Sequence, residues 1–210
     1  MSNVSLVWAT PGAEEMITRM ARVSAPKNQD NMDTAPRLLK YLITHAHWSP
    51  YEMANMCVEI NTTRAISAQI IRHRSFSFQE FSLRYAAASE IGSAVVPQLR
   101  RQDFKNRQNS IDDVSVETIQ KYHRRVAQLF EDSQHLYNEM ISEGIAKECA
   151  RFVLPLATPT RIYMNGTLRS WIHYLQLRCD ESTQREHREI AQQIKQIFTE
   201  QFPIISEAAF

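Results

Sequence analysis

Glycine is scarce in this 210-residue chain, which has only Gly12, Gly92, Gly144 and Gly166. Neither the GxGxxG dinucleotide fingerprint nor a phosphate-binding P-loop can be formed from glycines spaced so far apart. Rossmann and Walker-type nucleotide sites are therefore excluded. If a nucleotide binds this chain, arginine side chains, hydroxyl groups and helix N-termini must hold its phosphates in place of a glycine-rich turn.

Cysteine is also sparse, and its three positions, Cys57, Cys149 and Cys179, form no CxxC pair. An odd number at wide spacing argues against a disulfide framework, so we interpret all three as reduced packing residues. The histidines form no HExxH motif. His45 and His47 lie two residues apart at the end of an expected helix, where i,i+2 side chains do not share a face. We therefore expect no metal site.

Long apolar runs and a strong charge of one sign are absent as well. No stretch approaches the roughly 20 apolar residues of a membrane helix. The starting residues MSNVSLVWATPGAEEM lack the basic and apolar regions of a signal peptide. We therefore expect a cytoplasmic protein without a membrane partner. Since the net charge is only +1, no global positive field favours nucleic acid, and anions must be recognised by local clusters.

The hydrophobic patterning predicts one domain over residues 1–210, in a mostly helical α+β class around a small sheet. No internal repeat, low-complexity tract or linker suggests a second domain. We expect strands at 4–9, 56–60 and 161–164, the last ending in a turn at Asn165-Gly166. We expect helices at about 13–23, 35–45, 63–74, 116–142, 145–153, 167–178 and 182–201.

Two segments are expected to lack regular structure. Residues 75–88 mix aromatic with polar side chains, which suits an irregular loop packed against a pocket. Residues 98–110 are polar and basic, which is typical of an exposed, mobile connection. His123, His135 and His187 lie on long amphipathic helices, and we interpret them as ordinary surface or boundary residues.

The densest group of reactive side chains lies at residues 72–84, which hold three arginines and a histidine. At a helix end that opens into a loop, such groups can converge on phosphate and carbonyl oxygens with charge-assisted hydrogen bonds. A solvated basic helix end is the alternative interpretation. It fits the neighbouring Phe76, Phe78 and Phe81 poorly, because aromatics crowded between arginines indicate partial burial or stacking on flat rings.

The spacing within this group is RHR at 72–74, then seven residues, then SxR at 82–84. That is the signature of the flavin-dependent thymidylate synthases, and the chain resembles this family over nearly its whole length except about residues 90–115. Further similar segments are His45-Ala-His47-Trp48-Ser49-Pro50, Arg151-Phe-Val-Leu-Pro155-Leu, Thr160-Arg161, Leu168-Arg169-Ser170-Trp171 and Leu177-Arg178-Cys179-Asp180. The resemblance implies the thymidylate synthase-complementing protein fold and a homotetramer whose sites are shared between subunits.

The resemblance also implies the reaction, which is the reductive methylation of dUMP to dTMP. In this family 5,10-methylenetetrahydrofolate donates the one-carbon unit, NADPH reduces FAD, and the reduced flavin supplies the hydride that completes the methyl group. The implied partners are dUMP, the folate, NADPH and further copies of the chain, with no nucleic acid and no metal.

The site residues follow from the same resemblance. The implied FAD contacts are His47, Ser49, Arg72, His73, Arg74, Glu80, Thr167, Leu168, Arg169 and His173. The implied dUMP contacts are Gln69, Arg72, Glu80, Phe81, Ser82, Leu83, Arg84, Arg151 and Arg178, of which Arg178 is the catalytic residue. Gln184 and Glu186 also match family positions, but no role is implied for them.

The chemistry of the residues agrees with this assignment of Arg178. Hydride reaches C6 of uracil only if the ring becomes electrophilic, and a guanidinium beside N3 and its carbonyls stabilises the charge that develops. Arginine stays protonated and cannot be the base. Ser82 is an alternative nucleophile, yet no base is placed beside it, so we expect an anion-binding hydroxyl. The unrelated classical thymidylate synthases attack C6 with a thiolate in a Pro-Cys-His setting, which none of the three cysteines has.

Two rival hypotheses stay open at this point. One is a helical nucleic-acid-binding protein that uses Arg72, Arg74, Arg100, Arg101 and Arg107 against phosphates, against which the low net charge argues. The other is a flavoprotein of different activity, because a fold does not fix a function. Visible absorption by a bound flavin separates the first hypothesis from the family assignment.

Overall fold

The computed structural model describes residues 2–210 and is built around a four-stranded antiparallel sheet in the order β1-β2-β6-β3. The strands are β1 (Asn3–Ala9), β2 (Asn55–Thr63), β6 (Pro159–Thr167) and β3 (Ser77–Glu80). β2 and β6 pair along their full length, from Asn55 opposite Thr167 to Thr63 opposite Pro159. This ladder is the centre of the sheet.

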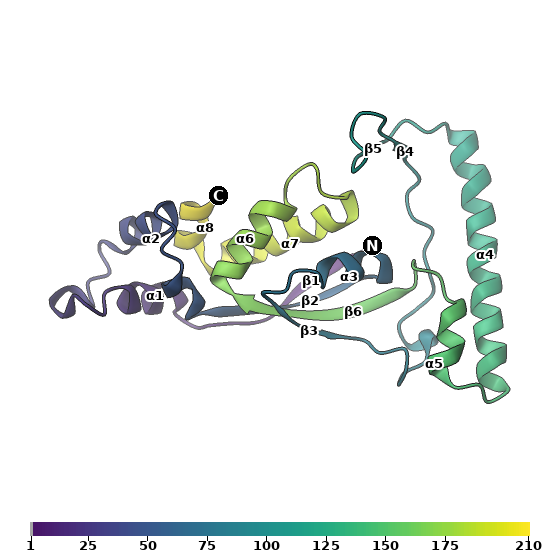
Figure 1. Cartoon of the computed structure of the whole chain (residues 1–210), viewed down its shortest axis with the longest axis horizontal. Coiled ribbons are helices and arrows are strands. Elements are labelled where there is room, and N and C mark those ends of the chain that lie inside the picture. The colour runs from purple at the N-terminus through teal and green to yellow at the C-terminus, as the bar shows by residue number, and fades with distance from the viewer. Residues whose placement is uncertain (1) are drawn as a thin grey trace.

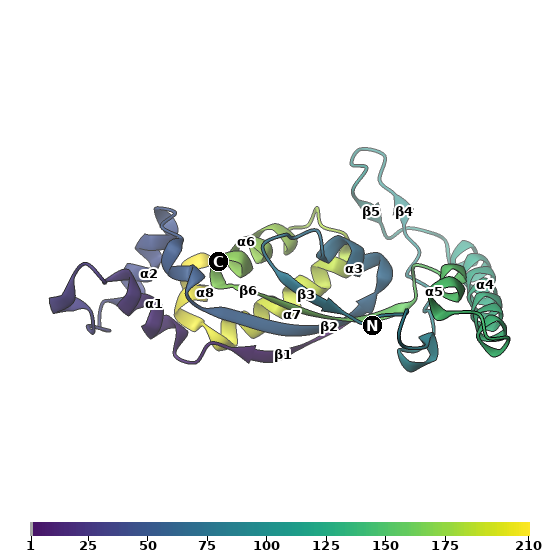
Figure 2. The ribbon, with the colours of Figure 1, turned by 60° about the horizontal axis from the view of Figure 1, so that its bottom comes forward.

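One face of the sheet is covered by two helices, α6 (Leu168–Arg178) and α7 (Arg185–Gln201), as Figure 1 and Figure 2 show. The alternating residues Met56, Val58 and Ile60 of β2 are fully buried against them. The indole nitrogen of Trp171 donates to the carbonyl of Met56 at 2.9 Å, which ties α6 directly to the sheet. The burial that the period-2 pattern predicts is therefore confirmed.

The two ends of the molecule carry the remaining elements (Figure 1). At one end lie α1 (Ala13–Ala21), α2 (Ala35–Thr44) and α8 (Pro203–Ala209), with the short helices η1 (Pro26–Asn28) and η2 (Ser49–Glu52). At the other end lie α4 (Val116–Ser142), α5 (Lys147–Ala150), η3 (Ala88–Glu90), η4 (Arg151–Val153) and the hairpin of β4 (Arg101–Gln102) and β5 (Ser110–Ile111). α3 (Arg64–Ile70) follows β2 directly and leads to β3.

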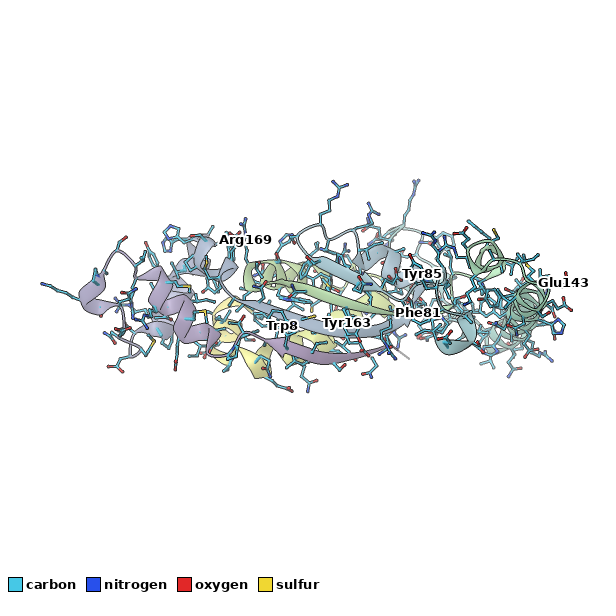
Figure 3. All side chains as sticks on the ribbon, turned by 90° about the horizontal axis from the view of Figure 1, so that it is seen from below. Trp8, Phe81, Tyr85, Glu143, Tyr163 and Arg169 are labelled. Atoms are coloured by element: carbon cyan, nitrogen blue, oxygen red, sulfur yellow. The ribbon has the colours of Figure 1, made fainter. Side chains whose placement is uncertain are left out.

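The second face of the sheet is open to the outside within residues 2–210. Figure 3 looks onto this face, where Trp8 and Tyr163 are labelled. The Trp8 side chain is 45% exposed, and the Tyr163 hydroxyl donates to Glu59 at 2.7 Å. The sheet therefore has one apolar face packed on helices and one mixed face without a helix on it.

Most predicted elements are present, and the α+β class is confirmed. The expected helix over 63–74 ends at Ile70, and residues 75–88 are not wholly irregular, because β3 pairs with β6 there. The predicted turn at Asn165-Gly166 is wrong, since β6 runs on to Thr167 along its ladder with β2. Residues 98–110 contain the β4–β5 hairpin, and α8 was not predicted. No helix in residues 2–210 combines the length and the apolar character needed to cross a membrane.

Candidate functional site

Two of the predicted site residues meet where α3 ends and α6 ends. Nε of Arg178 donates to Nε2 of His73 at 2.8 Å. Because Nε2 accepts this bond, the His73 ring is neutral and carries its hydrogen on Nδ1. Burial, with Arg178 and His173 nearby, lowers the pKa of His73 to about 4. A neutral imidazole therefore orients the guanidinium of Arg178 at ordinary pH.

α6 holds Arg178 in place through its capped start and its buried face. The Thr167 hydroxyl caps the helix by accepting from the Ser170 amide at 3.2 Å. Trp171 and Tyr174 are fully buried, and Arg178 follows Tyr174 by one turn, on the same side of the helix. A cation in the last turn also interacts favourably with the helix dipole. The position of Arg178 is therefore fixed by the packing of the whole helix.

A buried histidine stands beside this pair and was missed by the sequence interpretation. His187 of α7 is fully buried, so its reading as a surface or boundary residue was wrong. Its Nε2 lies 3.0 Å from the Tyr174 hydroxyl, and its Nδ1 lies 3.4 Å from Oε1 of Gln69. Ile190, Ala191 and other residues at helical spacing from position 187 are apolar and buried, a periodic signal that places His187 on the inner face.

A second group of predicted site residues lies around the start of α6. Ser49 begins η2, and Arg169 pairs with Glu52 of the same short helix. His173 follows Arg169 by one turn, and both side chains are exposed. Leu168 is fully buried in the core, and its amide donates to the carbonyl of Ala54 at 2.9 Å.

His47 reaches the surface through an unusual backbone turn. Ala46 has a φ of 56°, in the left-handed region that favours glycine. The His47 amide bonds the Leu42 carbonyl at 2.8 Å, and the Ala46 amide bonds the Ile43 carbonyl at 3.1 Å, which is the Schellman pattern that ends α2. This turn leaves His47 exposed beside η2.

Arg72 and Arg74 are both exposed, and neither makes an ion pair within residues 2–210. Guanidinium groups without a carboxylate partner are suited to bind phosphate oxygens by bidentate hydrogen bonds. Together with the exposed imidazoles of His47 and His173, this donor set fits the FAD that the resemblance implies. Within the described chain, no cluster of three or more histidine, cysteine or acidic side chains is arranged for a metal ion.

The predicted dUMP loop follows β3 and is held by α3. Oε1 of Glu80 accepts from Ser67 and Thr160, each at 2.9 Å, and pairs with Arg64 at 3.2 Å. Arg64 also donates to the Phe81 carbonyl at 2.6 Å. Glu80 is therefore committed to the framework that supports the loop.

The rest of this loop packs toward α4 and α5. Leu83 is buried with Tyr137, and Oγ of Ser82 accepts from the Arg84 amide at 3.3 Å. Arg84 pairs with Glu148 at 3.1 Å, with both side chains about half exposed. The Arg151 guanidinium lies 5.7 Å from the centre of the exposed Phe152 ring.

Among residues 2–210, the predicted site residues are spread along the sheet. Figure 3 shows Phe81 and Tyr85 toward the α4 end of the sheet and Arg169 toward the opposite end. Two hollows of about 180 and 440 Å³ are lined by other residues. The predicted FAD and dUMP residues are therefore spread between the start of α6 and the loop after β3.

Comparison with known proteins identifies the family. The family described as "Thymidylate synthase complementing protein" matches residues 5–204. The chain is 53% identical over 196 residues to the "Probable flavin-dependent thymidylate synthase" of Paramecium bursaria Chlorella virus 1, covering 93% of this chain and 90% of that protein. It is 52% identical over 195 residues to the flavin-dependent thymidylate synthase of Synechocystis sp., covering 93% and 88%.

A solved structure agrees with these sequence matches. The UMP/dUMP methylase PolB from Streptomyces cacaoi, bound with 5-Br dUMP, superimposes with a TM-score of 0.86 at 26% identity, covering 99% of this chain and 94% of that one. The family match spans almost the entire chain and agrees with the motif at residues 72–84. The chain therefore belongs to the thymidylate synthase complementing protein family, the flavin-dependent thymidylate synthases.

Proposed function

We propose that this chain converts dUMP to dTMP by reductive methylation, with 5,10-methylenetetrahydrofolate as one-carbon donor and NADPH-reduced FAD as the source of hydride. The observation that carries the proposal is the Arg178 guanidinium, held by a neutral His73 beside the exposed Arg72 and Arg74. The family membership supports it, and so does the structural similarity to PolB, which is described as bound with 5-Br dUMP.

Arg178 activates the pyrimidine electrostatically. Its Nε is used by His73, which leaves the two terminal nitrogens to donate toward N3 and a carbonyl oxygen of uracil. A fixed guanidinium at that edge stabilises the negative charge that develops on the ring as C6 accepts hydride. The bound flavin supplies the hydride chemistry itself. No cysteine takes part.

The cofactor residues are divided by their chemistry. Arg72 and Arg74 hold phosphate oxygens, and His73 stands between them and Arg178. His47, Ser49, Thr167, Leu168, Arg169 and His173 border the flavin around the start of α6, and Glu80 holds the loop beside it. Leu168 contributes by packing, because its side chain is fully buried.

The dUMP residues come from the loop after β3, from the end of α3, from η4 and, with Arg178, from the end of α6. Ser82, Arg84 and Arg151 bind the nucleotide phosphate, with Ser82 as an anion-binding hydroxyl. Phe81 and Leu83 shape the loop. Gln69 and Arg72 contact dUMP from the end of α3. Glu80 anchors the loop to Ser67, Thr160 and Arg64.

Sites of this kind require more than one copy of the chain. The separation of Arg169, at the start of α6, from Phe81, beside the Ser82 loop, supports a homotetramer of single-domain subunits, residues 1–210 each, with sites shared between them. α4 carries an exposed apolar stripe. In it Tyr122, Leu129 and Leu136 recur every seventh residue and are 44%, 63% and 46% exposed. Such a heptad stripe is suited to packing against another helix. We also propose a cytoplasmic location for the enzyme.

Release of tritium from C5-labelled dUMP tests the proposal. The purified protein is expected to be yellow, to release tritium only when NADPH and methylenetetrahydrofolate are both present, and to form dTMP. UMP serves as the comparison substrate, because PolB is described as a UMP/dUMP methylase. A folded protein that binds flavin but neither releases tritium nor forms dTMP would be a flavoprotein of another activity. A fully active monomer of 24.4 kDa by light scattering would refute shared sites.

A further inference from the structure

A continuous line of hydrogen bonds runs from the core to the start of α7, and apart from Gln69 its residues have no assigned role. The Tyr174 hydroxyl lies 3.0 Å from His187, and His187 lies 3.4 Å from Gln69. Gln69 donates to Gln184 at 2.6 Å, and Gln184 donates to Glu186 at 2.9 Å. We propose that this line holds the carboxamide of Gln69 in one orientation for dUMP, with His187 as the positioning residue on one side of the carboxamide and Gln184 on the other. This inference rests on the proposed function, since it concerns the dUMP site.

The carboxylate at one end determines the direction of every bond. Ionised Glu186 can only accept, so Gln184 must present its NH₂ group to it and its carbonyl oxygen to Gln69. Burial opposes ionisation of Glu186, yet hydrogen bonds from Gln184, its own backbone and Arg100 outweigh burial and lower its pKa. Gln69 therefore donates to Gln184, and its own carbonyl oxygen is left to accept from His187.

His187 closes the line only as a neutral ring with its hydrogen on Nδ1. In that tautomer Nδ1 donates to Gln69 and Nε2 accepts from the Tyr174 hydroxyl. Complete burial of the ring, with Arg178 and His73 nearby, lowers the pKa of His187 to about 3 and keeps it neutral. The four hydrogen bonds from Tyr174 to Glu186 thus share one direction.

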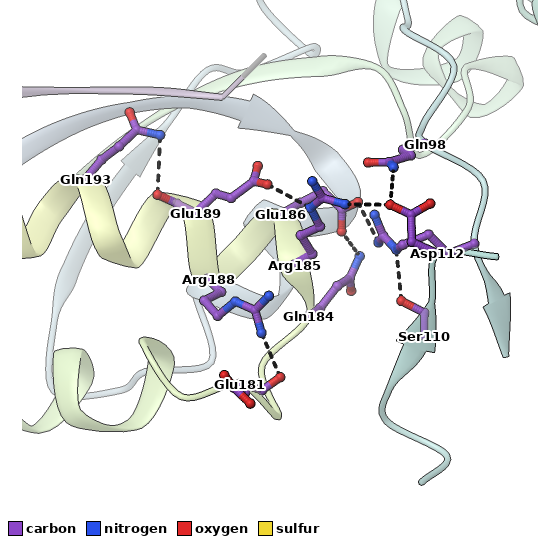
Figure 4. A network of polar contacts seen from close by, with 11 residues as sticks. Gln98, Ser110, Asp112, Glu181, Gln184, Arg185, Glu186, Arg188, Glu189 and Gln193 are labelled. Carbon is purple, nitrogen blue, oxygen red and sulfur yellow. Dashed lines mark hydrogen bonds and ion pairs between the residues drawn. The ribbon is translucent and has the colours of Figure 1, made fainter. Parts of the chain in front are cut away.

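Arg100, directly before β4, anchors the acceptor end of the line. Its Nη2 pairs with Oε1 of Glu186 at 2.7 Å, and its Nε donates to Ser110 at 2.8 Å. Although it lies in a segment expected to be an exposed connection, its side chain is only 11% exposed. Figure 4 shows Ser110, Gln184 and Glu186 together where the hairpin meets the start of α7.

This arrangement gives Gln69 a defined identity at each terminal atom. One N–H of Nε2 is used by Gln184, and one lone pair of Oε1 is used by His187. One N–H and one lone pair are left for a ligand. If the carboxamide turned over, a donor and an acceptor would exchange places, and a ligand group matched to one would meet the other. Loss of the His187 bond is therefore expected to weaken dUMP binding roughly tenfold.

Paired variants separate positioning from simple structure. His187→Phe keeps a ring in the buried space but removes both hydrogen bonds, whereas His187→Asn keeps an N–H donor near the place of Nδ1. With flavin-bound protein, calorimetry is expected to give a roughly tenfold higher dissociation constant for dUMP in His187→Phe and a value near wild type in His187→Asn. The KM for dUMP should follow, while the rate of flavin reduction by NADPH stays unchanged.

The hairpin offers a matched control at neighbouring positions. Arg100→Met removes the pair with Glu186, whereas Arg101→Met removes an ion pair with Asp113 whose side chains are 39% and 44% exposed. Of these two variants, only Arg100→Met is expected to raise the dissociation constant for dUMP. Tyr174→Phe provides a third break in the line if His187→Phe does not fold.

The results distinguish this inference from the proposed function. If wild-type protein binds no dUMP, both are overturned. If wild-type protein binds dUMP and the folded His187→Phe, Tyr174→Phe and Arg100→Met variants bind it equally well, only the positioning role is overturned. A loss of flavin reduction equal to the loss of dUMP affinity in these variants would likewise indicate a structural role.

Discussion

Arg178 donates its Nε hydrogen to Nε2 of His73 across 2.8 Å, although 105 positions separate the two residues in the chain. The contact joins a residue implied to bind FAD with the one implied to activate dUMP. It uses one side of the guanidinium and leaves the terminal nitrogens available. We therefore propose that His73 serves the pyrimidine chemistry through Arg178 in addition to any contact it makes with the flavin.

Substitution of His73 tests this link. His73→Phe removes the acceptor for Arg178, while His73→Gln keeps an acceptor oxygen at a similar reach. We expect dTMP formation to fall roughly 10- to 100-fold more in His73→Phe than in His73→Gln, because a mobile guanidinium is poorly preorganised. Rapid-mixing measurement of flavin reduction in both variants is the control. Equal rates of dTMP formation in the two variants would show that the Arg178 contact has no catalytic role.

Two histidines with lowered pKa values, the half-buried His73 and the buried His187, predict a pH dependence of stability. In the unfolded chain His73 and His187 titrate near pH 6.5, while in the folded chain their pKa values are lowered to about 4 and about 3. Below pH 6.5 the unfolded chain therefore binds more protons than the folded one. The contribution of the two histidines to the free energy of unfolding is fully present above pH 6.5. It is lost as pH falls toward 4, by up to about 1.4 kcal/mol per pH unit for each histidine.

Urea unfolding between pH 4.5 and 7.5 measures this slope. His187→Phe is expected to remove the part of the slope that His187 contributes and to leave the part that His73 contributes. A free energy of unfolding that stays constant from pH 7 to pH 4.5 would contradict the neutral state of both rings in the folded chain.

Gly166 predicts a second effect on stability. A Cβ atom at this position would lie 2.4 and 2.5 Å from two ring carbons of the buried Phe76. Gly166→Ala is expected to destabilise the fold by about 1–3 kcal/mol, because a well-packed core does not accommodate an added methyl group. Adding Phe76→Leu should make the double variant less destabilised than the sum of the single changes. Additive effects in urea unfolding would contradict the clash, and Ser77→Ala, at an exposed position of β3, is the control.

The cysteines give a prediction about the chemical mechanism. Cys57 is buried and Cys179 partly buried, and burial raises the pKa of both thiols, whereas Cys149 is exposed. A thiol reagent is expected to modify Cys149 first, with little effect on dTMP formation. The combined variant Cys57→Ala, Cys149→Ser, Cys179→Ala should still turn over. If one of these changes abolished turnover in a folded, flavin-bound protein, a thiolate mechanism would have to replace the present one.

The sequence predicts the elements whose signals are local. α4 begins and ends where expected, because Ser115 caps its start and Gly144, with a φ of 84°, follows its end. The turn signal Asn165-Gly166 failed because the nine-residue ladder of β6 with β2 holds these residues extended. In that ladder the glycine is needed for the approach of the Phe76 ring, a contact that no local pattern reveals.

The site shows the same limit. The sequence motif at residues 72–84 predicts the family and therefore the implied FAD and dUMP residues. It does not predict that His73 contacts Arg178, or that His187 reaches Gln69, because these contacts depend on how α3, α6 and α7 pack together. The apolar residues of α7 at helical spacing from position 187 indicate that His187 is buried. The interpretation of His187 as a surface or boundary residue gave more weight to its polar side chain than to this spacing.

Arg178→Ala tests the central claim most directly, with flavin reduction by NADPH and dTMP formation measured separately in the same preparation. The variant should keep its fold and its FAD and reduce the flavin at a near-normal rate, while dTMP formation falls by a factor on the order of 100 to 1,000. Arg178→Lys should recover little, because lysine lacks the planar fork that can serve His73 and the pyrimidine together. Near-normal dTMP formation in Arg178→Ala would contradict the account and show that another residue activates the pyrimidine.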